Sequence, residues 1–246
     1  MRRGQNSPVG KLLEKTSPGA SEPKENVQPL CEDMSQNRDN KMVKIKICGI
    51  TNIEDAEAAA GFGADMLGFI FAPSPRKIEP EKARDIIHNI PPFVKTVGVF
   101  VNEDPAMIKQ IMSFCGLDIV QLHGDESPDI CQGLMPRSVK SFRLKDESSL
   151  QDISSYCGKA RAFLFDTYAE NARGGTGKTF DWNLAIKGKK LGVPIILAGG
   201  LNPSNIKEAI AAVKPEAVDI CSGVEKYPGK KDPAAIKELM EAVRGY

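Results

Sequence analysis

Two side chains that can exchange protons stand at the ends of short apolar segments far apart in the chain. Cys48 ends the segment 43–48, and Asp166 ends the segment 162–166 and opens a long glycine-rich loop. Both segments have the composition of buried strands, and parallel α/β proteins place their chemistry at the carboxyl ends of such strands. We therefore expect the thiol and the carboxyl to face each other, an arrangement that can move two protons without a metal or a cofactor.

A free cysteine is usually a small buried hydrophobic residue, and the surroundings of Cys48 decide whether its thiol is chemically active. Lys46 lies two residues earlier on the same face of the predicted strand, and a nearby cation lowers a thiol pKa. A buried lysine needs a partner. Asp219, in the last predicted strand, becomes a neighbour of Lys46 if the strands close into a barrel. We also predict that Asp219 is a substrate-binding residue.

Asp166 has a plainer alternative role as a helix cap or a loop anchor. No helix start follows it, however, and residues 167–181 have the composition of a mobile lid. A carboxyl at the base of a lid is a candidate general acid.

Arg76 is a candidate anion-binding residue in the loop 71–77. A solvent-exposed charge is the commoner fate of such a residue. Two prolines stiffen the loop, however, and a guanidinium held over the mouth of a barrel would bind a carboxylate in bidentate fashion.

Two glycine-containing loops follow the last two predicted strands. They hold Gly199 and Gly200, and Ser222 and Gly223, respectively. Either loop alone means little, because glycine serves any tight turn. Together they predict a phosphate site built from backbone N–H groups. His123, after the fourth predicted strand, is expected with equal weight to line the pocket or to fix a loop.

From residue 42 onward, a strand, a loop and a helix alternate eight times. Strands are predicted at 43–48, 65–71, 95–101, 118–122, 138–143, 162–166, 194–198 and 217–221. Helices are predicted at 52–61, 80–89, 104–114, 127–133, 147–154, 183–190, 203–212 and 232–243, the seventh capped by Asn202-Pro203-Ser204. Eight regular units favour a single α/β domain, a closed (β/α)8 TIM barrel over 42–246, rather than a doubly wound open sheet.

Residues 1–41 differ from the rest of the chain in composition. They are rich in Ser, Pro, Asn, Glu and Lys and contain no aromatic residue, so we expect a disordered extension. Their acidic residues argue against an organelle address. Met42 directly precedes the first strand, and the functional protein could start there.

Composition narrows the class of protein further. The 246 residues carry a formal net charge of +1, which gives no overall field to recruit nucleic acid or an anionic membrane. The chain has no C-x-x-C pair among its six cysteines and holds two histidines, so a metal site is not expected. The cysteines are scattered through apolar segments, which fits a reducing compartment, so we expect a cytoplasmic protein. We expect it to be an enzyme that acts on a small phosphorylated molecule. We expect it to be a monomer or a weak homodimer.

Several segments, in their order along the chain, resemble the motifs of the phosphoribosylanthranilate isomerase family of tryptophan biosynthesis. They are 46–51, 74–76, 121–125, 174–182, 198–201 and 222–225. The resemblance covers 43–244 and implies a cofactor-free (β/α)8 barrel. The implied reaction is the Amadori rearrangement of N-(5-phosphoribosyl)anthranilate to 1-(2-carboxyphenylamino)-1-deoxyribulose 5-phosphate.

The resemblance also implies roles for individual residues. Cys48 would be the general base and Asp166 the general acid, Arg76 would hold the anthranilate carboxylate, and the loops at 199–202 and 222–225 would hold the phosphate. Three alternatives stay open: an indoleglycerol phosphate synthase, which normally uses a lysine and glutamates at strand ends; the related sugar isomerisation of histidine synthesis; and a non-catalytic barrel that binds a phosphorylated ligand.

Overall fold

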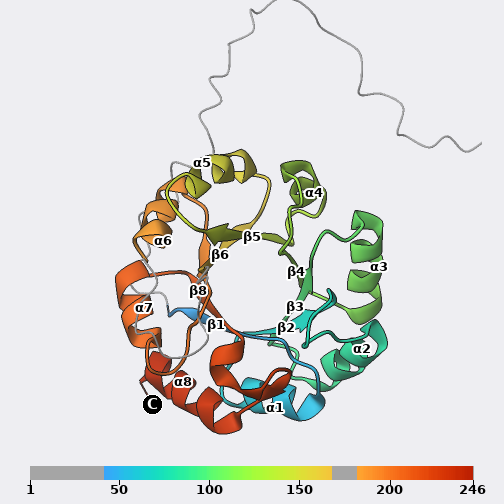
Figure 1. Ribbon diagram of the computed structural model, residues 1–246. Helices are drawn as coiled ribbons and strands as arrows, with labels where there is room; N and C mark the ends of the chain where they lie inside the picture. The colour runs from blue at the N-terminus through green and yellow to red at the C-terminus, as the bar shows by residue number, and fades with distance from the viewer. Residues whose placement is uncertain (1–41, 168–181, 246) are drawn as a thin grey trace, which may run out of the picture.

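The computed structural model describes residues 42–167 and 182–245. Within them, eight parallel strands close into a barrel in the order β1 to β8, and helices surround it (Figure 1). This confirms the predicted fold class. The predictions made for the extension 1–41 and for most of the lid, 168–181, concern residues outside the described part of the chain.

The barrel strands lie close to the predicted segments. They are β1 (Lys44–Cys48), β2 (Met66–Ile70), β3 (Lys95–Phe100), β4 (Ile119–Leu122), β5 (Ser138–Leu144), β6 (Ala162–Thr167), β7 (Ile195–Leu197) and β8 (Ala217–Ile220). The first strand pairs with the last, and the register sets Lys46 opposite Asp219 and Ile47 opposite Ile220. Closure therefore joins residues from the two ends of the domain.

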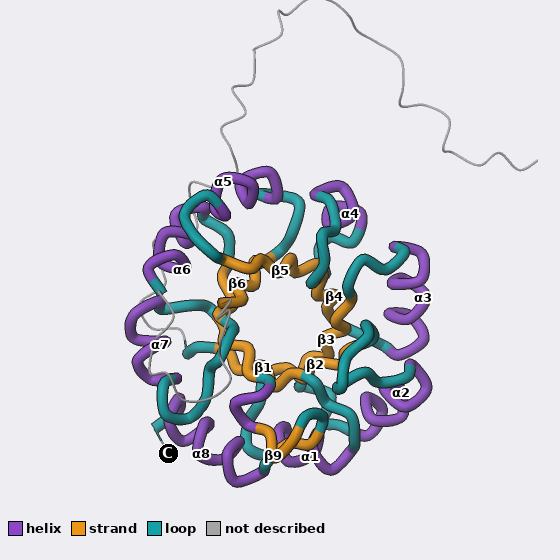
Figure 2. The backbone as a smooth tube through the Cα atoms, in the orientation of Figure 1, coloured by secondary structure: helices purple, strands orange, loops and turns teal. Residues whose placement is uncertain are grey.

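The helices form the outer ring (Figure 2). They are α1 (Ile53–Gly61), α2 (Pro80–Asn89), α3 (Pro105–Cys115), α4 (Pro128–Gly133), α5 (Ser149–Ile153), α6 (Asn183–Gly188), α7 (Ile206–Val213) and α8 (Pro233–Arg244). Short 3-10 turns, η1 (Ser154–Tyr156) and η2 (Lys189–Leu191), continue α5 and α6. No helix in the described ranges is long and apolar enough to cross a membrane.

Local sequence explains where several helices begin. The Asn52 side chain accepts a hydrogen bond from the Asp55 backbone N–H at 2.9 Å, and Asp232 does the same for Ala234 at 3.0 Å. Such caps satisfy backbone donors that the first helical turn leaves unpaired. Proline occupies the first turn in α2, α3, α4 and α8, where its missing N–H costs nothing.

The predicted start of the seventh helix was wrong. The Asn202 side chain accepts hydrogen bonds from the Ser204 backbone N–H and hydroxyl, at 2.9 and 2.6 Å, and so stabilises a turn rather than a helix. Helix α7 begins at Ile206. A small hairpin, β9 (Glu225–Tyr227) and β10 (Lys230–Lys231), was not predicted; it follows the 3-10 turn η3 (Ser222–Val224).

Successive side chains along each strand point alternately out of and into the barrel, and this divides the core into two parts. Outward side chains such as Ile45, Ile47 and Leu67 pack against the helices in the larger cluster. Inward side chains fill the lumen in a second cluster that includes Val139, Leu164, Ile196, Ala198 and Ala217. Each fully buried aliphatic side chain stabilises the fold by about 1.5–3 kcal/mol. The lumen cluster closes the barrel interior below the polar side chains at the carboxyl ends of the strands.

Candidate active site

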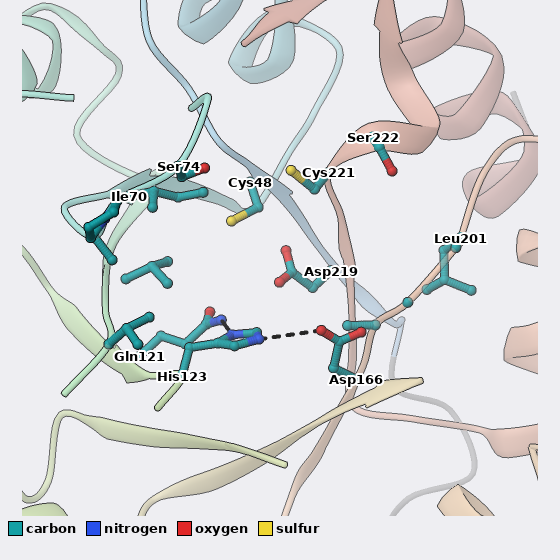
Figure 3. A pocket seen from close by; sticks show the side chains of 17 residues that line it. Cys48, Ile70, Ser74, Gln121, His123, Asp166, Leu201, Asp219, Cys221 and Ser222 are labelled. Carbon is teal, nitrogen blue, oxygen red and sulfur yellow. Dashed lines mark hydrogen bonds and ion pairs between the residues drawn. The ribbon is translucent and has the colours of Figure 1, made fainter. Parts of the chain in front are cut away.

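A cavity of about 340 Å³ opens at the carboxyl ends of the barrel strands. Cys48, His123, Asp166, Asp219 and Cys221 all line it. Figure 3 shows the two cysteines beside each other on one side, the His123–Asp166 pair on the other, and Asp219 between them. The structure therefore brings the predicted thiol and carboxyl into one cavity, from strands β1 and β6.

Lys46 and Asp219 form a buried ion pair beneath the cavity. The Lys46 Nζ lies 2.9 and 3.0 Å from the two Asp219 oxygens, and the side chains are 1% and 8% exposed. Burial alone would lower the Lys46 pKa, but the Asp219 carboxylate and Cys48 outweigh burial and hold this pKa above its ordinary value. The pairing expected from barrel closure is thus present, and Lys46 is a fixed cation beside Cys48.

The pKa of Cys48 moves in the direction opposite to the one predicted. Its hydrogen bond with Cys221 and its burial raise the pKa, and these effects outweigh the lowering by Lys46. The pKa of Cys221 is lowered to about 7 by its hydrogen bond with Cys48 and by Lys231 and Arg76, against burial. Cys221 is therefore the thiol with the lowered pKa, next to Lys231 and Arg76.

His123 connects the candidate general acid to strand β4. Its Nε2 lies 3.3 Å from Asp166 Oδ2, and its Nδ1 lies 2.9 Å from the side-chain nitrogen of Gln121. The two ring nitrogens of His123 therefore contact the Asp166 carboxyl on one side and the Gln121 amide on the other. Of the two predicted alternatives, the structure places His123 in the cavity lining, in contact with the Asp166 carboxyl.

The two glycine loops meet over the cavity. Gly199 and Gly200 have φ angles of +88° and +64°, in the left-handed region that glycine tolerates, and both line the cavity with Ser222. Gly223 is not among the lining residues. A Cβ there would lie 1.9 Å from the Leu201 carbonyl oxygen, so Gly223 allows the loops after β7 and β8 to touch.

Arg76 is directed to a glutamate beside the cavity instead of into it. Its Nε donates to Glu225 at 2.8 Å and its Nη2 at 2.7 Å, and Arg76 is not among the residues that line the cavity. Its Cδ would lie 2.8 Å from a Cβ placed on Gly49, so the side chain crosses the backbone next to Cys48. The loop therefore holds Arg76 at the cavity edge, with its Nε and Nη2 donors directed at Glu225.

Sequence reasoning missed three residues that shape this site. Lys231 is fully buried, with Nζ 2.9 Å from Glu225 and 3.0 Å from the Cys221 carbonyl oxygen. The adjacent pair Lys230-Lys231 has the pattern of a solvated surface, and nothing local marks Glu225 or Cys221 as their neighbours. Only Cys221 was a usable signal, since it lies at the carboxyl end of the last strand as Cys48 lies at the carboxyl end of β1.

The site offers hydrogen-bond donors and proton-transfer groups. Among the described residues, no group of three or more His, Cys, Asp or Glu side chains is placed to hold a metal ion. The cavity instead combines a thiol near a cation, a carboxyl held by an imidazole, and glycine-rich backbone suited to an anion. These groups suit acid–base chemistry on a small phosphorylated molecule.

Comparisons with known proteins agree with this geometry. A family model described as N-(5'phosphoribosyl)anthranilate (PRA) isomerase matches residues 45–242. The N-(5'-phosphoribosyl)anthranilate isomerase of Geobacter sulfurreducens is 50% identical over 206 residues, which are 83% of this chain and 100% of that protein. A crystal structure of phosphoribosyl anthranilate isomerase from Thermotoga maritima superposes with a TM-score of 0.78 at 44% identity, covering 83% of this chain and 100% of that one.

A second crystal structure, of phosphoribosyl anthranilate isomerase in complex with reduced 1-(o-carboxyphenylamino)-1-deoxyribulose 5-phosphate, has a TM-score of 0.75 at 41% identity. It covers 83% of this chain and 100% of that one. The matches extend from the first barrel strand to the last helix. The chain therefore belongs to the N-(5'-phosphoribosyl)anthranilate isomerase family.

Proposed function

We propose that this cavity isomerises N-(5'-phosphoribosyl)anthranilate to 1-(2-carboxyphenylamino)-1-deoxyribulose 5-phosphate, with Asp166 as the general acid and Cys48 as the general base. The observation that carries the proposal is the placement of both groups in one cavity, on different strands. The family supports the reaction, and one family structure holds a reduced form of the product.

The first proposed step opens the furanose ring. Asp166 gives a proton to the ring oxygen as the bond from that oxygen to C1′ breaks, and the nitrogen lone pair forms a C1′=N double bond. The contact of His123 Nε2 with Oδ2 leaves Oδ1 to carry the transferred proton. The product of this step is a cationic Schiff base, which makes the hydrogen on C2′ more acidic.

The second proposed step removes that hydrogen. The Cys48 thiolate takes the C2′ proton, the C–H electrons form a C1′=C2′ double bond, and the C1′=N electrons return to nitrogen. The enolamine then tautomerises to the ketone. The positive charge of Lys46 stabilises the thiolate, and Asp219 holds Lys46 in place beside Cys48.

The charged ends of the substrate would be bound on either side of these groups. The loops that carry Gly199, Gly200, Ser222 and Gly223 would hold the phosphate through backbone N–H groups. Arg76 would hold the anthranilate carboxylate through Nη1, since Glu225 already fixes its other edge. The ion pair with Glu225 lowers the entropic cost of this contact by fixing the guanidinium before substrate binds.

An assay of the full chain on freshly generated N-(5'-phosphoribosyl)anthranilate tests the proposal. Loss of the fluorescent substrate and appearance of the ketose product are expected, with competitive inhibition by inorganic phosphate. An amide NMR titration with phosphate should shift Gly200 and Ser222. Phosphate binding without turnover would show a non-catalytic barrel, and turnover with no effect of phosphate at these amides would refute the proposed phosphate site.

A further inference from the structure

The two thiols of the cavity lie on the strands that close the barrel. Ile47 of β1 is in register with Ile220 of β8, and Cys48 and Cys221 are the next residue on each strand path. Both line the cavity, and Figure 3 shows the two side chains beside each other on one side of it. The chain thus places two cysteines from opposite ends of its sequence side by side.

This placement satisfies the geometric requirement for a disulfide. Neighbouring strands lie about 4.7–4.9 Å apart, and disulfides join residues whose Cα atoms are about 4.4–6.8 Å apart. The two thiols are also close enough for each to influence the pKa of the other. A bond between them would not require either strand to leave the sheet.

The charges around the pair mark Cys221 as the thiol that reacts first. Lys231 Nζ lies 4.0 Å from the Cys221 sulfur and is fully buried. Arg76 adds a second cation, and together with the hydrogen bond from Cys48 these charges lower the Cys221 pKa to about 7. A thiolate is the nucleophilic form of cysteine, and here it faces a cavity that a small oxidant can enter.

Two other cysteines of the described chain lie in different surroundings. Cys115 and Cys131 are fully buried, and burial raises the pKa of each to about 11. Thiols of this kind are inert. Oxidation is therefore expected to favour the cavity pair over Cys115 and Cys131.

We propose that Cys48 and Cys221 are a redox-modification site at which a hydroperoxide switches the enzyme off reversibly. The Cys221 thiolate attacks the terminal peroxide oxygen, the O–O bond breaks, and the leaving oxygen takes up a proton, so hydrogen peroxide yields Cys221 sulfenic acid and water. The Cys48 thiol then attacks the sulfenic sulfur, which gives a Cys48–Cys221 disulfide and a second water. The two sulfurs together lose two electrons, and the peroxide gains them.

The loss of activity rests on the proposed role of Cys48, because the disulfide removes the sulfur that takes the C2′ proton. Formation of the disulfide itself does not depend on that role. Bound substrate or inorganic phosphate should slow the oxidation, since either ligand would occupy the cavity through which the peroxide reaches Cys221. A dithiol reductant should restore both thiols and the activity.

The test treats the reduced full chain with hydrogen peroxide, blocks the remaining thiols by alkylation, and maps the peptides by mass spectrometry beside an activity assay. The variants are Cys221→Ser and, as a matched control at a buried cysteine outside the cavity, Cys115→Ser. Wild type and Cys115→Ser should yield a peptide that links Cys48 to Cys221. Their activity should fall in proportion to that link and return with dithiothreitol. Cys221→Ser should yield no link and no loss that dithiothreitol reverses.

Several results would overturn the inference: free thiols at both positions after inactivation, a disulfide between other cysteines, or equal reversible inactivation of Cys221→Ser. A separate measurement on reduced Cys48→Ser distinguishes this inference from the proposed function. If that variant is inactive and no link forms in wild type, only the redox inference fails. If it is active, the assignment of the general base fails whether or not the link forms.

Discussion

Cys48 shows how far a residue's chemistry depends on neighbours that are remote in sequence. Lys46 was a usable local signal, and barrel closure correctly predicted its partner Asp219. The direction of the Cys48 pKa was not predictable, because it depends on Cys221, which lies on another strand. The same holds for Arg76, whose partner Glu225 follows a different strand and whose contact depends on how two loops meet.

The raised Cys48 pKa predicts a pH dependence of catalysis. A general base acts in its deprotonated form, so kcat/KM should increase as the pH rises through the Cys48 pKa. Replacing Cys221 by alanine removes the hydrogen bond that contributes most to this rise, so the increase in Cys221→Ala should shift to lower pH. Profiles of kcat/KM against pH for wild type, Cys221→Ala and the control Cys115→Ala decide this. An unchanged profile, or a shift to higher pH, would contradict the prediction.

At the scale of elements, strands were predictable and their connections were less so. Each barrel strand is a short apolar run rich in β-forming residues, so composition alone located all eight. The start of α7 and the β9–β10 hairpin depend on particular side-chain contacts. The hairpin is attached to α1 by Asp55, which accepts hydrogen bonds from Lys230 Nζ at 2.6 Å and from the Lys231 backbone N–H at 2.7 Å. No local pattern encodes such a contact, because its partners are 175 and 176 residues apart in the sequence.

The Lys46–Asp219 ion pair joins β1 to β8, and the loss of one partner should destabilise the fold more than the loss of both. Asp219→Ala leaves Lys46 buried without its partner, and breaking a buried pair in this way costs about 3–5 kcal/mol of unfolding free energy. The double variant Lys46→Met, Asp219→Leu removes both charges and should recover much of that loss. Urea denaturation gives the unfolding free energies of the single and the double variant.

The control for that experiment is the exposed pair of Lys237 and Glu241 on α8. Glu241→Ala should cost only about 0.3–0.5 kcal/mol, because solvent screens such a pair. If the unfolding free energy of Asp219→Ala lies within about 1 kcal/mol of the wild-type value, the buried pair does not stabilise the junction of β1 and β8.

At the scale of the whole molecule, one end of the barrel carries the cavity and the other joins the start and end of the domain. Arg244 at the end of α8 donates to Asp65 Oδ2 at 2.7 Å, and Lys44 at the start of β1 donates to Asp65 Oδ1 at 2.8 Å. These contacts lie at the amino ends of the strands, opposite the cavity. The described domain is thus tied together at its base without involving the site.

Residues 1–41 are proposed to be dispensable for catalysis. The family model begins at residue 45, and the Geobacter sulfurreducens protein matches over its whole length within 206 residues of this chain. A protein that starts at Met42 keeps all eight strands and every residue of the cavity. Its kcat/KM and Tm should equal those of the full chain. A large loss of either would mean that the extension packs on the barrel.

The central claim is that Cys48 and Asp166 exchange the protons of the isomerisation, and turnover by two conservative variants tests it most directly. Cys48→Ser and Asp166→Asn should each keep the wild-type circular dichroism spectrum and Tm while kcat falls by roughly 10²–10⁴-fold, the usual contribution of a general acid or base. A folded variant of either kind that keeps kcat within a few-fold of wild type would contradict the account.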